Sequence, residues 1–302
     1  MQRPDRPAPA TVCPVAGPGG LPVLEVNNPL ARAQVSLQGA QLLSFQPHGQ
    51  PDWLFLSPRA RFEPGQPIRG GVPVCWPWFG PDPEAQGRPA HGFARQRPWA
   101  LRQHTDDSDG TTRLTLALND DPSTRALWPH AFELRLDIRV GRTLRLSLST
   151  RNTGDTAFTI TQALHSYFAV DHIDTVRVLG LEGSGFIDQL PGAAARGEAS
   201  GEPLRFHGRL DRIYQPVPAR LQLLGAAGGR TLDLRSEGSR TAVLWNPGAE
   251  LAATMSDLGP DTHQRFVCVE TANAGDDTLR LPPGGQHRLT VEIAALAAGV
   301  LP

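Results

Sequence analysis

Polar and apolar residues alternate without a break along residues 132–140, and the alternation resumes along residues 144–148. In an extended chain successive side chains point to opposite faces, so the apolar set shares one face and the charged set the other. The apolar set consists of Phe132, Leu134, Leu136, Ile138, Val140, Leu144, Leu146 and Leu148. Gly141 and Arg142 separate the two runs. The pattern predicts an antiparallel hairpin with one dry face and one solvated face.

Other short apolar segments continue this plan between Leu21 and Ile293, and Gly, Pro, Asn or Asp residues separate them. They fall at residues 21–26, 33–37, 42–45, 114–118, 158–168, 176–178, 221–223, 232–234, 242–245, 266–269 and 289–293. Many short strands between turn residues indicate an all-β sandwich or barrel. One short helix is expected at residues 123–127, with Ser123 as its N-cap.

The first twenty residues differ in composition from the rest of the chain. They are rich in Pro, Gly and Ala, which predicts an extended or poorly ordered lead-in over residues 1–20. Residues 21–302 show no composition shift that would mark a boundary. Since all-β domains reach roughly 200–250 residues, we expect residues 21–302 to form one domain.

The net charge of −1 gives no electrostatic reason to expect nucleic acid or an anionic membrane as a partner. No apolar run is long enough to span a bilayer, and the N-terminus lacks the apolar core of a secretory signal. The three cysteines, Cys13, Cys75 and Cys268, lie far apart and predict neither a disulfide framework nor a thiolate zinc site. We therefore expect a cytoplasmic protein.

One irregular stretch, residues 69–95, combines glycines, prolines, aromatic residues, arginines and a histidine. Gly and Pro exclude a regular element, and a solvated loop would avoid Trp76, Trp78 and Phe79. Aromatic faces beside fixed Arg and His side chains suit a polar ligand with apolar C–H faces, such as a sugar. A loop that fills the core and carries two surface arginines is the equally weighted alternative.

Two further residues stand in unusual surroundings. His165 interrupts an apolar and aromatic run, where an imidazole must be hydrogen-bonded or functional. Glu270 ends the apolar segment at residues 266–269, a rigid position that suits either a general base or a rim salt bridge. His91, His165 and Glu270 would form a metal site only if the fold brought them together, and because no metal-ligand motif is present we predict no metal.

Six short blocks occur in the order found in one known family. They are RGGVPVCWPWFGP at 69–81, HGFAR at 91–95, ALHSYFAV at 163–170, LDRIY at 210–214, WNPG at 245–248 and FVCVETA at 266–272. Together they resemble the aldose 1-epimerase (mutarotase) superfamily, and within it the hexose-6-phosphate mutarotase branch, also called glucose-6-phosphate 1-epimerase. The resemblance implies a large antiparallel β-sandwich of the galactose mutarotase type, no cofactor, and a monomer.

The resemblance also implies roles for individual residues. His165 would be the general acid and Glu270 the general base, and His91 would bind the substrate and help to polarise it. Asp211 would bind a sugar hydroxyl, and Arg69 and Arg95 would bind the substrate phosphate. Some relatives have Gln where this chain has Ala90, and an aromatic residue and a Lys where it has Gly248 and Leu251.

The implied reaction interconverts the α and β anomers of an aldohexose 6-phosphate by opening and closing the ring. Glu270 would take the proton of the C1 hydroxyl while His165 protonates the ring oxygen. The carboxylate must then stay ionised, so we expect hydrogen-bond donors around it. Trp76, Trp78 or Phe79 would stack on the sugar, or else pack beneath the loop. The rival functions are a mutarotase for unphosphorylated aldoses and a non-catalytic carbohydrate-binding protein.

Overall fold

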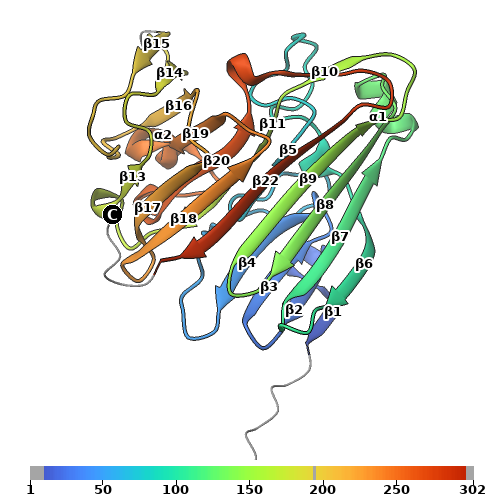
Figure 1. Ribbon diagram of the computed structural model, residues 1–302, viewed down its shortest axis with the longest axis horizontal. Helices are drawn as coiled ribbons and strands as arrows, with labels where there is room; N and C mark the ends of the chain where they lie inside the picture. Colours follow the sequence, from blue (N-terminus) through green and yellow to red (C-terminus); the bar gives the residue numbers. More distant parts are fainter. Residues whose placement is uncertain (1–9, 193–194, 297–302) are drawn as a thin grey trace, which may run out of the picture.

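The computed structural model describes residues 10–192 and 195–296. It confirms the all-β prediction, because strands dominate and every paired strand runs antiparallel to its neighbours. The strands form two eight-stranded sheets, a four-stranded sheet and a two-stranded sheet (Figure 1). The two-stranded sheet pairs β10 (Phe158–Ile160) with β21 (Leu279–Leu281).

The predicted hairpin is the centre of the first eight-stranded sheet. Strand β8 (Phe132–Val140) pairs with β9 (Leu144–Asn152) from Phe132 opposite Asn152 to Val140 opposite Leu144. On the β9 side the strands run from the edge inward as β13 (Arg177–Leu179), β17 (Arg220–Ala226), β18 (Arg230–Glu237) and β22 (Gln286–Ala295), and β22 pairs with β9. On the β8 side β7 (Thr112–Asn119) pairs with β8, and β6 (Ala100–Asp106) forms the other edge. Figure 1 shows these strands side by side across the molecule.

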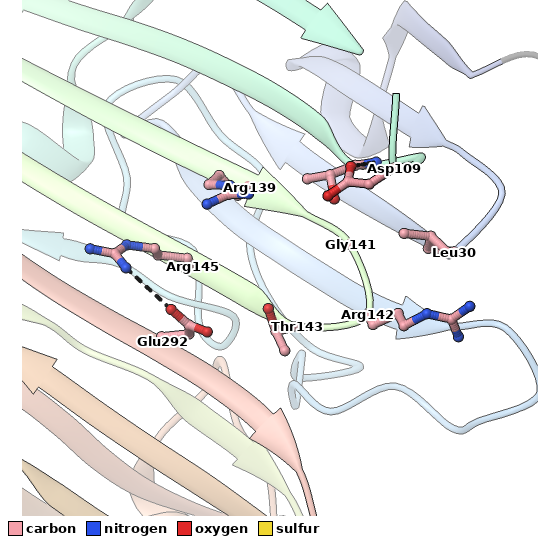
Figure 2. Close-up of a pocket in the computed structure, with 9 residues that line it drawn as sticks. Leu30, Asp109, Arg139, Gly141, Arg142, Thr143, Arg145 and Glu292 are labelled. Carbon is pink, nitrogen blue, oxygen red and sulfur yellow. Dashed lines mark hydrogen bonds and ion pairs between the residues drawn. The ribbon is translucent and has the colours of Figure 1, made fainter. Parts of the chain in front are cut away.

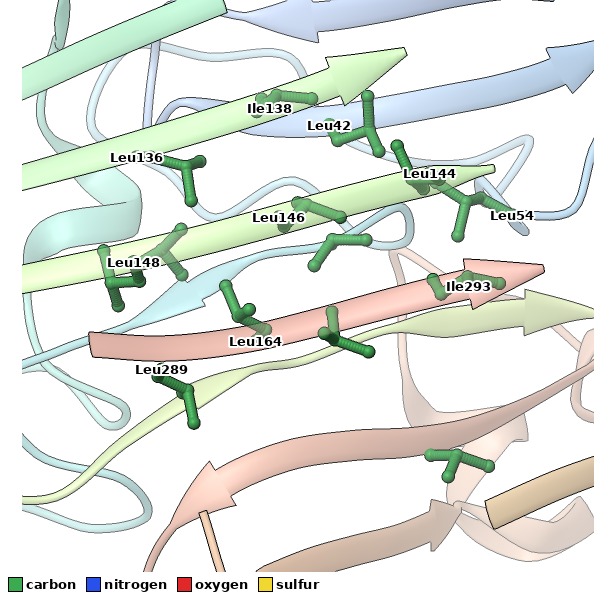
Figure 3. Packing of buried hydrophobic residues seen from close by; sticks show 14 of the residues in the cluster. Leu42, Leu54, Leu136, Ile138, Leu144, Leu146, Leu148, Leu164, Leu289 and Ile293 are labelled. Atoms are coloured by element: carbon green, nitrogen blue, oxygen red, sulfur yellow. The ribbon is translucent and has the colours of Figure 1, made fainter. Parts of the chain in front are cut away.

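The alternating leucines of this sheet form the main core. Leu136, Leu146 and Leu148 are fully buried, as are Leu289 and Ile293 of β22. They pack on residues from other parts of the chain, including Leu42, Leu54 and Leu164 (Figure 3). Burying each such side chain contributes about 1.5–3 kcal/mol, so the period-2 pattern also fixes which face of the sheet points inward.

The second eight-stranded sheet carries two of the residues singled out for chemistry, Asp211 and Glu270. Its order is β15 (Arg196–Glu198), β14 (Gly185–Asp188), β16 (Leu210–Tyr214), β19 (Thr241–Asn246), β20 (Phe266–Asn273), β11 (Gln162–Leu164) and β5 (Val74–Cys75), and β12 (Tyr167–Ala169) also pairs with β20. Strand β20 is buried along its whole length, because neighbouring strands flank it and both of its faces are covered.

The four-stranded sheet corrects the prediction for the N-terminal lead-in. Its strands are β1 (Thr11–Ala16), β2 (Pro22–Asn27), β3 (Ala31–Ser36) and β4 (Gln41–Pro47). Residues 11–20 were expected to lie outside the domain, yet β1 pairs with β2 along its full length. Backbone hydrogen bonds hold this largely exposed edge strand, and they do not depend on apolar side chains. Residues 1–9 lie outside the described residues.

Helices are short and peripheral. They are α1 (Pro122–Leu127) and α2 (Gly248–Thr254), with 3-10 turns η1 (Pro18–Gly20), η2 (Ala94–Gln96), η3 (Ile173–Thr175), η4 (Thr262–Arg265) and η5 (Gly275–Asp277). The expected helix α1 is present, but its N-cap is Asp121 and not Ser123, because Asp121 accepts the backbone N–H of Thr124 in a capping box. Among the described residues, no helix is both long and apolar enough to cross a bilayer.

Candidate active site

His165 and Glu270 meet because β20 has two partners on the same side. Strand β11 pairs with it through Leu164 opposite Thr271, and β12 pairs through Tyr167 opposite Cys268. His165 lies in the break between β11 and β12, directly beside Glu270. Nε2 of His165 is 3.4 Å from Oε1 of Glu270, and both side chains are buried. The two residues that the sequence analysis proposed as an acid–base pair are therefore adjacent.

A cavity of about 480 Å³ opens above this pair. The proposed site residues that line it are Arg69, Phe79, His91, Arg95, His165, Asp211 and Glu270. These residues come from three loops, from the 3-10 turn η2 and from strands β16 and β20, so the tertiary structure gathers segments that are distant in the sequence.

Two glycines allow the irregular stretch to reach the cavity. A Cβ at Gly71 would lie 2.1 Å from the carbonyl oxygen of Leu42, and one at Gly92 would lie 2.0 Å from that of Trp76. Both residues have positive φ, which glycine adopts without strain. The close approach at Gly92 docks the 91–95 segment against Trp76 and directs His91 and Arg95 toward the cavity that Arg69 also lines.

His91 is held as a neutral hydrogen-bond donor. The backbone N–H of Gly80 donates to its Nδ1 at 3.3 Å, which places the ring proton of the neutral imidazole on Nε2. Burial, together with the positive charges of Arg95 and Arg69, lowers the pKa of His91 to about 3. Its backbone adopts a left-handed φ of 63°, uncommon for a residue other than glycine, and its N–H bonds the carbonyl of Gly80 at 2.7 Å. This imidazole can donate to a substrate oxygen but stays uncharged near neutral pH.

The environment of Glu270 contradicts one expectation from the sequence. We expected donors around an ionised carboxylate, but Oε2 of Glu270 has no hydrogen-bond partner among the described residues. Burial, reinforced by the negative charge of Asp211, raises the pKa of Glu270 well above its usual value. Burial likewise lowers the pKa of His165, and its Nδ1 is also without a partner within the described part of the chain. The pair therefore favours a protonated Glu270 beside a neutral His165.

The two arginines are held in different ways. Arg69 donates from Nε to Asp257 at 3.1 Å and from Nη1 to the hydroxyl of Tyr167 at 3.0 Å, which leaves Nη2 toward other partners. Arg95 donates from Nη2 to the carbonyl of Ala90 at 2.9 Å, and its buried Nε has no partner in the described residues. A buried guanidinium N–H without an acceptor is costly in the free protein and suits an anionic ligand.

The aromatic residues of the loop separate into core and cavity. Trp76 is fully buried and packs against Phe93, Trp128 and Phe132, so the expectation that it stacks on a sugar is wrong. Phe79 lines the cavity and lies edge-on to His91, with ring centroids 4.9 Å apart. The difference follows from the chain path, because the Gly92 segment covers Trp76 and leaves Phe79 at the cavity wall.

Several residues in or beside the cavity were not singled out from the sequence. Gln189 lines the cavity and donates to Asp211 at 2.6 Å, and burial raises the pKa of Asp211. Trp245 lines it beside Val243 on β19, and Tyr167 stacks on His165 with centroids 4.8 Å apart. Trp245 lies within the WNPG block, which was a usable signal. Gln189 lies in a polar loop that carries no comparable pattern.

A second cavity, of about 280 Å³, lies at the turn between β8 and β9 (Figure 2). Arg139, Arg142 and Arg145 line it, together with Asp109 and Glu292. Arg145 is already paired with Glu292 at 3.2 Å and with Glu237 at 3.1 Å. None of the proposed site residues lies there, and its charges largely offset one another, so the first cavity is the candidate active site.

The profile of the Aldose 1-epimerase family matches residues 22–294. The chain is 41% identical over 254 residues to a Salmonella typhimurium protein provisionally named glucose-6-phosphate 1-epimerase, with 84% of each chain covered. An Escherichia coli protein with the same provisional name is also 41% identical, over 256 residues, covering 85% of this chain and 84% of that one.

Solved structures give the same result for the fold. A crystal structure of a provisionally named mutarotase from Salmonella typhimurium superposes with a TM-score of 0.84 at 38% identity, covering 91% of this chain and 90% of that one. A galactose mutarotase related enzyme from Lactobacillus acidophilus gives a TM-score of 0.73 at 16% identity, with 91% and 97% covered, and this likeness concerns the fold alone. The expected sandwich of the galactose mutarotase type is confirmed.

Proposed function

We propose a function from one premise: this chain belongs to the aldose 1-epimerase family. The family interconverts sugar anomers, and the substrate we propose is an aldohexose 6-phosphate, first of all glucose 6-phosphate. The observation that carries the proposal is the 3.4 Å contact between His165 Nε2 and Glu270 Oε1 in a cavity that two arginines also line.

The reaction needs two proton movements at one bond. As the C1–O5 bond breaks, the C1 hydroxyl loses its proton to a base and an acid protonates O5. The open-chain sugar then rotates about C1–C2, and closure on the other aldehyde face reverses both transfers. A positioned acid or base contributes about 10²–10⁴-fold in rate, and this reaction has a place for one of each.

The pair carries one proton throughout this cycle. If ring opening begins with imidazolium and carboxylate, it ends with neutral His165 and protonated Glu270, and closure restores the first arrangement. Burial favours the second arrangement, which is also the arrangement present while the sugar is open. Either arrangement supplies one acid and one base, so the roles implied by the family resemblance describe one direction of a symmetric exchange.

Phosphate recognition is the finer part of the proposal. Arg95 offers a buried, unpartnered Nε among the described residues, and Arg69 offers its Nη2 while Asp257 and Tyr167 fix the rest of the guanidinium. Charge-assisted bonds from planar guanidinium groups suit phosphate oxygens. Asp211 would accept from a sugar hydroxyl, His91 would donate to a sugar oxygen, and Phe79 would contact a C–H face.

The protein would act as a cytoplasmic monomer. All the residues proposed for the site lie on one chain, as a monomeric enzyme requires. The proposed substrate carries a phosphate dianion, which does not cross a bilayer unaided. An enzyme that acts on a sugar phosphate made in the cytoplasm would therefore work in the cytoplasm.

The test measures anomer exchange by NMR on glucose 6-phosphate and on glucose. Wild-type protein is compared with Glu270→Gln, and with Glu250→Gln, an exposed carboxylate on α2, as the matched control. Acceleration confined to the phosphorylated sugar and lost only in Glu270→Gln supports the proposal. Equal acceleration of both sugars would replace it with a general aldose mutarotase, and no acceleration of either would favour the non-catalytic binding protein.

A further inference from the structure

Cys268 is a third potential metal ligand beside the proposed catalytic pair. It lies on β20 two residues before Glu270, and it pairs across the sheet with Trp245 and with Tyr167. Its Sγ, one ring nitrogen of His165 and a carboxylate oxygen of Glu270 all lie within 4.8 Å of one another. All three residues are buried, so these atoms are held in place by the packed sheet.

We propose that His165, Cys268 and Glu270 form a binding site for Zn²⁺, and that the bound ion inhibits the enzyme. Imidazole nitrogen, thiolate sulfur and carboxylate oxygen are the three ligand types that zinc uses in proteins. Two ligands about 2.1 Å from a tetrahedral zinc stand about 3.4 Å apart. Nε2 of His165 and Oε1 of Glu270 already have this separation, 3.4 Å. The distances from Sγ of Cys268 to the other two ligand atoms are at most 4.8 Å. They would need to shorten by about 1 Å, because the usual zinc–sulfur bond is about 2.3 Å.

An unpartnered polar atom at the same place gives independent support. Oε2 of Glu270, on the same carboxyl group as the ligand atom Oε1, is buried without a hydrogen-bond partner among the described residues. Buried polar atoms are nearly always satisfied, and exceptions call for an unseen ligand or a functional role. His165 and Glu270 also line the 480 Å³ cavity, so an ion can enter from it and keep a fourth position open to water.

The proton balance of binding is favourable for so buried a site. Before binding, the Cys268 thiol, the Glu270 carboxyl group and the neutral His165 carry no net charge. Forming the metal–sulfur and metal–oxygen bonds releases the thiol proton and the carboxyl proton to solvent. The two positive charges of Zn²⁺ replace the two protons, so the net charge of the site does not change. Arg69, whose positive charge acts on the Cys268 thiol, is already paired with Asp257.

Inhibition follows from the ligand set and rests on the proposed function, whereas binding does not. A metal bound by His165 and Glu270 occupies the nitrogen and oxygen that would exchange protons with the sugar. A zinc-loaded molecule would therefore be inactive, and a chelator would restore its rate. Cys268 is the ligand that distinguishes this site from the acid–base pair alone.

Binding is tested with Co²⁺ as a spectroscopic probe on the chelator-treated, full-length protein. We expect one equivalent of Co²⁺ to give the visible bands of a tetrahedral site and a near-ultraviolet sulfur-to-cobalt charge-transfer band, both removed by one equivalent of Zn²⁺. Cys268→Ser should lose the sulfur band. Cys75→Ser, a buried cysteine on β5 outside the three-residue cluster, should keep it. A band that is absent from the wild type, persists in Cys268→Ser, or disappears in Cys75→Ser would overturn the proposal. If Cys268→Ser does not fold, Cys268→Ala gives the same comparison.

The activity measurement separates this inference from the proposed function. Zn²⁺ is titrated against anomer exchange, and each variant is compared with its own metal-free rate. We expect the half-inhibiting concentration to rise at least tenfold in Cys268→Ser and to stay unchanged in Cys75→Ser. A cobalt–sulfur band in a protein without epimerase activity would overturn the proposed function alone. An active enzyme with no band would overturn the metal site alone.

Discussion

Replacing Glu270 by Gln tests the centre of the site, because the change keeps the side-chain volume and removes the titratable proton. Glu270 is 1% exposed, and Oε1 lies 3.4 Å from Nε2 of His165. An amide at this position cannot accept and return a proton. Since a positioned acid or base contributes about 10²–10⁴-fold, we expect the exchange rate at saturating substrate to fall by that factor. Substrate affinity should change little, because Arg69 and Arg95 remain.

The same substitution should change how stability depends on pH. Burial raises the pKa of Glu270, so the unfolded chain loses this proton at a lower pH than the folded protein does. Between the two pKa values the folded state holds one more proton, and the wild-type free energy of unfolding falls as pH rises. The slope is at most about 1.4 kcal/mol per pH unit for one proton. Glu270→Gln lacks this contribution. The free energy of unfolding of the variant, minus that of the wild type, should therefore rise with pH.

The measurements are anomer exchange by NMR and urea unfolding at several pH values, with Glu250→Gln as the control for a generic loss of one carboxylate. The control should match the wild type in both. The reasoning is refuted if Glu270→Gln keeps the wild-type rate, or if its free energy of unfolding runs parallel to that of the wild type from acid to alkaline pH. The first result would remove the residue from the chemistry, and the second would show that its carboxyl group is not shielded from water.

Other predictions follow from the same cavity. Arg95→Gln should raise KM for glucose 6-phosphate about 10- to 150-fold, the equivalent of a charge-assisted hydrogen bond worth about 1.5–3 kcal/mol. The kinetic constants for glucose should stay unchanged. An equal effect on both sugars would argue against a phosphate contact. Trp76→Ala truncates a core residue and should lower the free energy of unfolding, measured by chemical unfolding, by about 3–5 kcal/mol. Phe79→Ala changes the cavity wall and should mainly raise KM, measured by steady-state kinetics. A raised KM in Trp76→Ala with unchanged stability, or a large loss of stability in Phe79→Ala, would show that the two residues are misassigned. With a chelator present to remove metal ions, kcat/KM should persist below pH 6.5, because burial lowers the pKa of His165. It should fall as pH rises through the raised pKa of Glu270, because the pair then loses its last proton. A loss of activity that begins at pH 6.5 on acidification would indicate an ordinary imidazole.

The sequence alone was enough for the fold class and for the hairpin at its centre. Side-chain alternation is a local property, so residues 132–140 and 144–148 predicted both strands, their turn and their buried face. It was not enough for β1, because an exposed edge strand is held by backbone hydrogen bonds that leave no apolar pattern. The cap of α1 was displaced for a similar reason, since Asp121 and Ser123 are both plausible caps until the backbone path is known.

The candidate residues came from the sequence, but their arrangement did not. Local pattern and family resemblance together named His165 and Glu270, yet only the pairing of β11 and β12 with the same strand places them 3.4 Å apart. Packing also decided that Trp76 belongs to the core and that Oε2 of Glu270 has no hydrogen-bond partner among the described residues. Cys268 gained meaning only beside that pair. Strand identity is encoded over a few neighbouring residues, whereas the cavity depends on long-range strand pairing and close backbone approaches, which local patterns do not specify.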